Sequence, residues 1–202
     1  METKKLVYKV NSTTEIVSHG ADTNAKEIRE TSIRGMVRRW FAALGKKELC
    51  DEILGAGDSA KHSASKVIFR VDNVSPKMDS FTLTIIERNL KKGALYSWEE
   101  LKNVVETWLI LGGLGGKQKS GCGSIYCEEL LLDTREEWLA NARERLKGSS
   151  LYVSEEKPAG GKYKTKCVKL KNETFKVYIA ERARGKPQKP GSRNSFNFCK
   201  KQ

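Results

Sequence analysis

The order of helix-like and strand-like patterns most constrains the fold of this 202-residue chain. Residues 32–44, SIRGMVRRWFAAL, carry apolar side chains at the three-and-four spacing of one helix face. A second such stripe begins after Ser97, which forms a capping box with Glu100. Two strand-like runs, 65–74 and 80–89, lie between them and are joined by a short turn that contains proline. A strand hairpin is therefore expected between two helices.

Further strands are expected on both sides of this unit. Residues 5–10, KLVYKV, alternate in polarity, and 123–132, GSIYCEELLL, reads as a last strand. Residues 4–132 then spell strand, helix, strand, strand, helix, strand, which is the split βαβ order of ferredoxin-like α+β domains, including the RNA-recognition fold. The basic-Gly-aromatic motif of RNA-recognition domains is absent, so this order does not by itself assign a function. A second capping box, Thr134 with Glu137, predicts a helix after the last strand.

The first predicted helix has a polar face of interest. Thr31 or Ser32 is its expected N-cap. Gly35 lies in its first turn, where glycine costs about 1 kcal/mol relative to alanine. It indicates close packing or the close approach of a ligand, although a tolerated helix glycine is an alternative. Three arginines accompany it: Arg34, Arg38 and Arg39.

Residues 111–125, LGGLGGKQKSGCGSI, concentrate glycine and lysine in one predicted loop between a helix and a strand. Glycine adopts backbone angles that other residues avoid and lets another molecule approach the main chain. With Lys117 and Lys119 inside it, such a loop suits a phosphate-bearing partner. A flexible turn is the alternative interpretation.

The net charge of +13 is concentrated at the C-terminal end. Residues 1–146 hold 23 Lys and Arg against 21 Asp and Glu, a net of +2, whereas residues 147–202 hold 15 against 4, a net of +11. A basic surface attracts polyanions such as nucleic acid. Within this tail, KCVKLK and FKVYIA predict a hairpin or edge strand, and RARGKPQKPGSRN is expected to be a flexible clamp for RNA. A solvated tail that only aids solubility is the alternative.

Other features exclude several classes of protein. No apolar run is long enough to cross a bilayer and the first residues lack a secretory pattern, so a soluble cytoplasmic protein is expected. Five widely spaced cysteines fit neither a disulfide framework nor a paired zinc site, which predicts reduced thiols. The tryptophans are assigned to the core rather than to base stacking because they lie on helix stripes: Trp40, Trp98, Trp108 and Trp138.

Three ordered segments together resemble a known family. HGADTNAKEIRETSIRGMVRRWFAAL, ILGAGDSAKHSASKVIFRV and LILGGLGGKQKSGCGSI are similar to segments of the RAMP superfamily, the RNA-binding subunits of CRISPR effector complexes. The pattern is most like that of the type III-B, or Cmr, subunit at the end of the backbone. The resemblance implies a ferredoxin-like RAMP domain over residues 1–133, followed over 134–202 by a helix and a basic C-terminal extension.

The same resemblance implies a function and a site. The chain is expected to be a non-catalytic RNA-binding subunit of a type III effector in antiviral defence, without a cofactor. Its expected partners are guide RNA, target RNA and other effector subunits, with no membrane contact. Glycine amides, a helix N-terminus and basic side chains would hold RNA phosphates without reading bases. The expected RNA-binding residues are Ser32, Arg34, Gly35, Arg38, Arg39, Gly112, Gly113, Gly115, Gly116, Lys117, Lys119, Gly121 and Gly123.

Alternative functions remain open. Some family members cleave target RNA with an aspartate in the loop after the first strand, and Asp22 lies in the corresponding loop here, where it would bind Mg²⁺. A turn-forming role for Asp22 is the preferred interpretation. His19 and His62 are the candidate acids or bases of a guide-processing ribonuclease, but neither has an identifiable partner. No Walker-type loop or zinc motif occurs. An adaptor whose basic tail binds an acidic protein is a further alternative.

Overall fold

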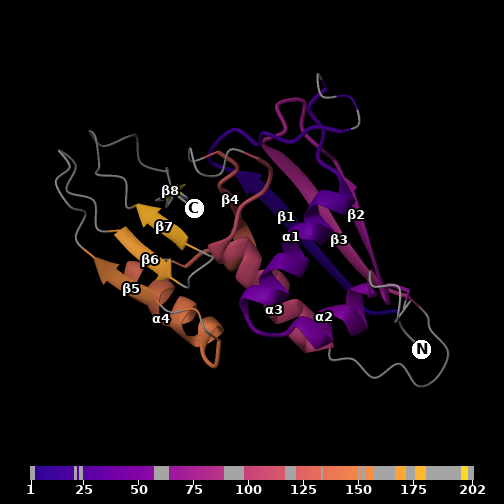
Figure 1. The fold of residues 1–202 in the computed structure, drawn as a ribbon. Coiled ribbons are helices and arrows are strands. Elements are labelled where there is room, and N and C mark those ends of the chain that lie inside the picture. Colours follow the sequence, from indigo (N-terminus) through magenta and orange to yellow (C-terminus); the bar gives the residue numbers. More distant parts are fainter. Residues whose placement is uncertain are drawn as a thin grey trace.

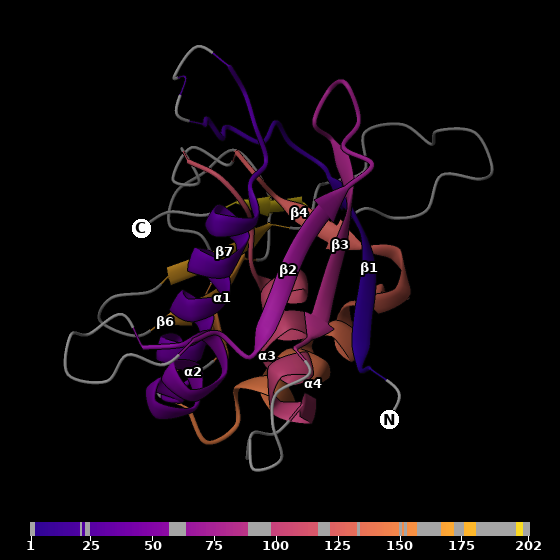
Figure 2. The same cartoon turned by 90° about the vertical axis from the view of Figure 1, so that its right-hand side faces the viewer.

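The computed structural model describes residues 3–20, 22, 25–56, 64–88, 98–116, 122–132, 134–149, 151, 153–156, 167–171, 176–180 and 197–199. Four antiparallel strands form the first sheet in the order β2-β3-β1-β4. The strands are β1 Lys5–Ser12, β2 Val67–Asp72, β3 Ser80–Glu87 and β4 Ile125–Cys127. Helices α1 Glu30–Ala43 and α3 Trp98–Leu111 complete the predicted ferredoxin-like order. In Figure 2, α3 lies behind β2 and β3.

The core lies between the helices and one face of this sheet. Val10, Leu83 and Ile85 of the strands are fully buried, as are Trp40 of α1 and Trp108 of α3. Trp98 and Trp138 are buried as well, so the prediction that all four tryptophans belong to the core is confirmed. Burial of a large aromatic side chain contributes a few kcal/mol to stability. These indole rings therefore stabilise the fold and are not exposed for base stacking.

Two predicted element ends are wrong. The N-cap of α1 is Arg29, which caps with no side-chain hydrogen bond, rather than Thr31 or Ser32. The amide of Ser32 already donates to the Arg29 carbonyl, at 3.1 Å, so Ser32 lies within the first turn. The last strand is also shorter than residues 123–132, because the chain turns into a 3-10 helix, Glu128–Leu130, directly after β4.

Helix α2, Lys47–Leu54, was not predicted and follows α1 after a tight connection at Gly45. Helix α4, Arg135–Leu146, begins at the predicted capping box. The amide of Glu137 donates to the Thr134 hydroxyl, and the amide of Thr134 donates to the Glu137 carboxylate, both at 3.2 Å. The capping box predicted at Ser97 lies outside the described residues, because Ser97 is not among them.

A second antiparallel sheet follows α4 and has the order β5-β6-β7-β8. Its strands are β5 Val153–Glu156, β6 Cys167–Lys171, β7 Lys176–Ala180 and β8 Asn197–Cys199. The predicted hairpin is confirmed by the pairing of β6 with β7, and Figure 1 shows this sheet beside α4. The predicted clamp, residues 182–194, lies outside the described residues. Among the residues that are described, no helix has the length and apolar character needed to cross a membrane.

Candidate functional site

The glycine-rich segment lies between α3 and β4, and its described ends pair with each other. Gly113 and Ser124 form a β-bridge, and the amide of Leu114 donates to the Gly123 carbonyl at 2.8 Å. The Trp108 indole donates to the Gly113 carbonyl at 3.1 Å. The turn is therefore fixed to the end of α3 at its base, whereas Lys117, Lys119 and Gly121 lie outside the described residues.

This paired segment docks on the connection between β1 and α1. The amide of Gly116 donates to the Val17 carbonyl at 2.6 Å, and the amide of Gly123 donates to the Glu15 carbonyl at 2.8 Å. Further along the same connection, the amide of Glu27 donates to the Ser18 carbonyl at 2.9 Å, shortly before α1 begins. The connection thus joins two sequence segments that the resemblance places in one site.

Three glycines of the segment are required by packing. A Cβ atom on Gly123, whose φ is +73°, would lie 1.8 Å from the Leu114 carbonyl oxygen. A Cβ on Gly115, whose φ is +87°, would lie 2.6 Å from the Val17 oxygen. On Gly112 it would lie 2.2 Å from the Trp108 oxygen. Real Cβ atoms do not approach so closely, and positive φ disfavours residues with side chains. These positions therefore need glycine whether or not a ligand binds.

Two glycines have no such requirement. Gly35 is exposed on α1, and a Cβ atom there would meet no described atom within 4 Å. Gly116 is exposed as well, and its Cβ would make only an ordinary contact of 3.5 Å with the Val17 oxygen. Close packing, one of the interpretations offered for Gly35, is therefore excluded within the described part of the chain. A bare main chain is left at the surface at both places.

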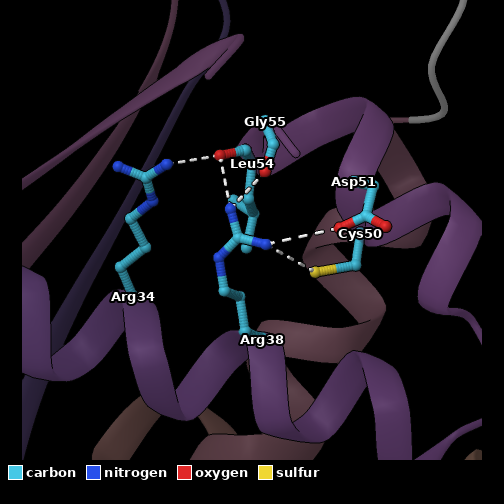
Figure 3. Close-up of polar contacts among 6 residues, drawn as sticks. All are labelled: Arg34, Arg38, Cys50, Asp51, Leu54 and Gly55. Carbon is cyan, nitrogen blue, oxygen red and sulfur yellow. Dashed lines mark hydrogen bonds and ion pairs between the residues drawn. The ribbon is translucent and has the colours of Figure 1, made fainter. Parts of the chain in front are cut away.

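Two of the α1 arginines, Arg34 and Arg38, lie against the C-terminal end of α2 (Figure 3). Arg38 donates from Nη2 to the carbonyls of Leu54, at 2.9 Å, and Gly55. Its Nη1 lies 3.5 Å from the Asp51 carboxylate and 3.8 Å from the Cys50 sulfur. Arg34 donates to the Leu54 carbonyl as well. Since the last carbonyls of a helix have no partner within it, Arg38 completes the C-terminus of α2.

The remaining α1 residues of the expected site differ in their exposure to solvent. Arg39 is exposed and Ser32 is half-buried. Burial, and then the neighbouring positive charge of Arg38, lower the pKa of Arg34. The hydrogen bonds of Arg34 and Arg38 lead to the C-terminal end of α2 and not to the glycine-rich segment. The two halves of the expected site are therefore linked through main-chain contacts of the β1–α1 connection.

The candidate catalytic residues lie on that connection. His19 forms a β-bridge with Lys26, and the Asp22 carbonyl accepts a hydrogen bond from the Ala25 amide at 3.2 Å. This hydrogen bond is typical of a turn, and the role of the Asp22 carboxylate stays a prediction. Within the described residues, no group of three His, Cys, Asp or Glu side chains is placed to hold a metal ion. His62 lies outside the described residues.

The described cysteines have the expected reduced form. Cys50, Cys122 and Cys127 are free thiols, and Cys50 and Cys127 are buried. Burial raises the pKa of the Cys50 thiol. Burial, reinforced by the hydrogen bond to the Glu129 carboxylate, raises the pKa of Cys127 to about 12. Because a thiolate is the reactive form, burial makes both thiols weaker nucleophiles at neutral pH.

Sequence reasoning missed two arginines. Arg29 is the N-cap of α1, and its buried Nε has no hydrogen-bond partner in the described part of the chain. Arg88, directly after β3, donates from Nη1 to the Ser65 carbonyl at 3.2 Å. Arg29 precedes α1 and Arg88 follows β3, so neither belongs to the periodic pattern of a helix or strand. The sequence therefore carries no signal that would have distinguished them from other arginines.

Comparison with known proteins identifies the family. A search of curated proteins gave no significant match. The model of the RAMP superfamily matches residues 12–126, which run from the end of β1 to β4 and contain both α1 and the glycine-rich segment. Because this match covers more than half of the chain, the protein belongs to the RAMP superfamily.

Proposed function

We propose that this protein is a non-catalytic RNA-binding subunit of a type III CRISPR effector complex. Membership of the RAMP superfamily indicates a CRISPR-associated, RNA-binding role. The finer assignment, to a type III-B end-of-backbone subunit in antiviral defence, rests on the resemblance of the three quoted segments. In this role the chain binds the backbone of guide or target RNA, and base pairing between the two RNAs supplies sequence choice.

The exposed glycines are the observation that carries the proposal. Gly35 and Gly116 leave main chain open in two family segments, and packing among the described residues does not require glycine at either position. A helix-interior glycine costs about 1 kcal/mol, so its presence on an exposed face calls for another reason. Close approach of a phosphodiester backbone supplies one.

The chemistry of the other residues supports backbone contact rather than base recognition. The net charge of +13 favours a polyanion. All four tryptophans are buried and so cannot stack on bases. Lys117 and Lys119 lie inside the glycine-rich sequence, where they would add charge without reading base identity. We therefore keep the glycines, these lysines, Arg34 and Arg39 as the proposed RNA-binding set, and leave out Arg38, whose terminal nitrogens bind α2 and Gly55.

The proposal is tested by purifying the protein with its native partners at low salt and sequencing the nucleic acid that it retains. Guide RNAs built from repeat and spacer sequences are the expected result. An RNA-free preparation bound to another protein would contradict the proposal and favour the acidic-partner adaptor. In the assembled complex, Asp22→Ala should leave target RNA cleavage unchanged, and loss of metal-dependent cleavage would instead favour the nuclease alternative.

A further inference from the structure

Three arginines, two from α1 and one directly after β3, meet at the α2–β2 junction, defined here as Ile53, Leu54, Gly55, Ser65 and Lys66. The backbone closes this junction, because the amide of Lys66 donates to the Ile53 carbonyl at 2.8 Å. Arg34 and Arg38 reach the Leu54 carbonyl from α1. Arg88 reaches the Ser65 carbonyl at 3.2 Å, and its own amide donates to the Lys66 carbonyl at 2.8 Å. Guanidinium groups thus gather at both ends of one connection.

The donors of these arginines are used to different extents. The two terminal nitrogens of Arg38 donate to four acceptors inside the protein, one of which is the Asp51 carboxylate. Among the described residues, Arg34 and Arg88 each donate one hydrogen bond, to a carbonyl, and form no ion pair. A guanidinium carries five N–H donors in a fork that matches phosphate. Within the described part of the chain, most of the donors of Arg34 and Arg88 are therefore unused, which suits a ligand with several acceptor oxygens.

The charges nearby point to an anion. The two α2 carboxylates next to the junction are already engaged, Asp51 with Arg38 at 3.5 Å and Glu52 with Lys66 at 2.9 Å. The positive charges of Arg38 and Arg88 add to burial in lowering the pKa of Arg34, so these guanidinium groups repel one another across the junction. An anion placed between Arg34 and Arg88 would relieve this repulsion.

We propose that Arg34 and Arg88 together bind a phosphate of the RNA backbone at the α2–β2 junction, while Arg38 is a positioning residue that holds α2. This inference rests on the proposed function and adds Arg88, which no sequence pattern indicated. RNA is favoured over a protein carboxylate because Arg34 is adjacent to the exposed Gly35, where backbone access is already open. The RNA path then extends from α1 to the end of β3.

The test measures binding of the full chain to a fluorescein-labelled single-stranded RNA by anisotropy over a series of NaCl concentrations. The variants are Arg34→Ala, Arg88→Ala and the double variant. Loss of one phosphate contact should reduce the slope of log K against log salt by about 0.7. Because both arginines are assigned to one phosphate, the double variant should lose about the same slope as the stronger single variant.

Two controls separate charge from structure. Arg38→Ala should lower the melting temperature and, where it is still folded, keep the wild-type salt slope. Arg70→Ala, an exposed arginine of β2, should change neither quantity. Wild-type slopes in Arg34→Ala and Arg88→Ala, or an equal loss in Arg38→Ala, would overturn the inference while leaving the proposed function intact. If the wild-type chain itself does not bind RNA, both the inference and the proposed function fail.

Discussion

Individual glycines of the two family segments serve different physical purposes. Gly112, Gly115 and Gly123 lie where a Cβ atom would collide with a carbonyl oxygen, whereas Gly35 and Gly116 are exposed and uncrowded. A sequence pattern treats all of them alike. The difference depends on residues distant in the chain, such as Val17 beside Gly115, and therefore appears only in the folded molecule.

The pair Gly35→Ala and Gly123→Ala tests this division. Gly35→Ala should raise the free energy of unfolding by about 1 kcal/mol, because alanine is the better helix former and meets no crowding. It should also weaken RNA binding several-fold, because the new methyl group occupies the open main chain. Gly123→Ala should lower the free energy of unfolding by about 2 kcal/mol or more, through its positive φ and its clash with Leu114. Urea denaturation and RNA titration measure these quantities.

The opposite signs expected for the two variants in the free energy of unfolding are the decisive result. A Gly35→Ala variant that is stabilised and binds RNA as tightly as the wild type would show that no ligand approaches α1 at this residue. A stabilised Gly123→Ala variant would show that the glycine-rich turn relaxes easily, which contradicts the packing described for it.

At the scale of elements, the predicted order of strands and helices follows from periodic patterns, but α2 does not. Its eight residues, Lys47–Leu54, are too few to form a stable helix alone. Two features outside this short segment stabilise the C-terminal end of α2. Gly55 ends the helix at a φ of +80°, and Arg38 of α1 donates hydrogen bonds to the carbonyls of Leu54 and Gly55. Because the second comes from another element, local sequence could not predict this helix.

The candidate site could be predicted only in part, because some of its contacts also come from elements distant in the sequence. The family segments identify the residues of α1 and the glycine-rich segment, since both are continuous in sequence. The direction of the Arg38 side chain depends on α2, which was missed, and the position of Arg88 beside Ser65 depends on strand pairing. Contacts between distant elements are thus the part that the sequence left undetermined.

A cluster of polar side chains joins α4 to α3 and β1 of the ferredoxin-like domain. Arg145 of α4 forms an ion pair with Glu106 of α3 at 2.9 Å, and the two side chains are only 16% and 14% exposed. Arg145 also donates to Asn103 at 3.0 Å, and the Tyr8 hydroxyl of β1 lies 3.4 Å from the Glu106 carboxylate. Trp138, Leu139, Ala142 and Leu146 of α4 are buried. The predicted boundary at residues 133 and 134 therefore precedes a helix that packs on the first domain.

Arg145→Ala should lower the free energy of unfolding by about 3–5 kcal/mol, because it leaves the Glu106 carboxylate buried without its ion-pair partner. Adding Glu106→Gln should restore part of this loss, since the unpaired charge is removed. The matched control is Lys147→Ala, whose pair with Glu144 spans 3.8 Å with both side chains more than 70% exposed, and its effect should be below about 1 kcal/mol. Equal effects of Arg145→Ala and Lys147→Ala in chemical denaturation would refute a structural role for the cluster.

At the scale of the whole molecule, the described buried residues and the excess positive charge lie in different parts of the chain. The buried residues described extend to Leu151, at the end of the segment that follows α4. The charge excess lies mainly beyond it: residues 152–202 hold 14 Lys and Arg against 4 Asp and Glu, a net of +10. The core, as far as side chains are described, and the proposed site thus lie before residue 152, whereas residues 152–202 contain most of the electrostatic attraction for a polyanion.

A chain that ends at Leu151 should separate these two properties. It should fold with a free energy of unfolding within about 1–2 kcal/mol of the full chain, because Val153 is the one side chain in the described part of the removed segment that packs on the core. RNA binding should be weaker and less dependent on salt. If the removed part contacts three phosphates, the slope of log K against log salt falls by about 2. A truncated chain that keeps the full slope would show that the basic part does not contact RNA, which favours an acidic protein as its partner. A reduced slope in a folded truncated chain would instead indicate that the second sheet and the ferredoxin-like domain bind the same RNA.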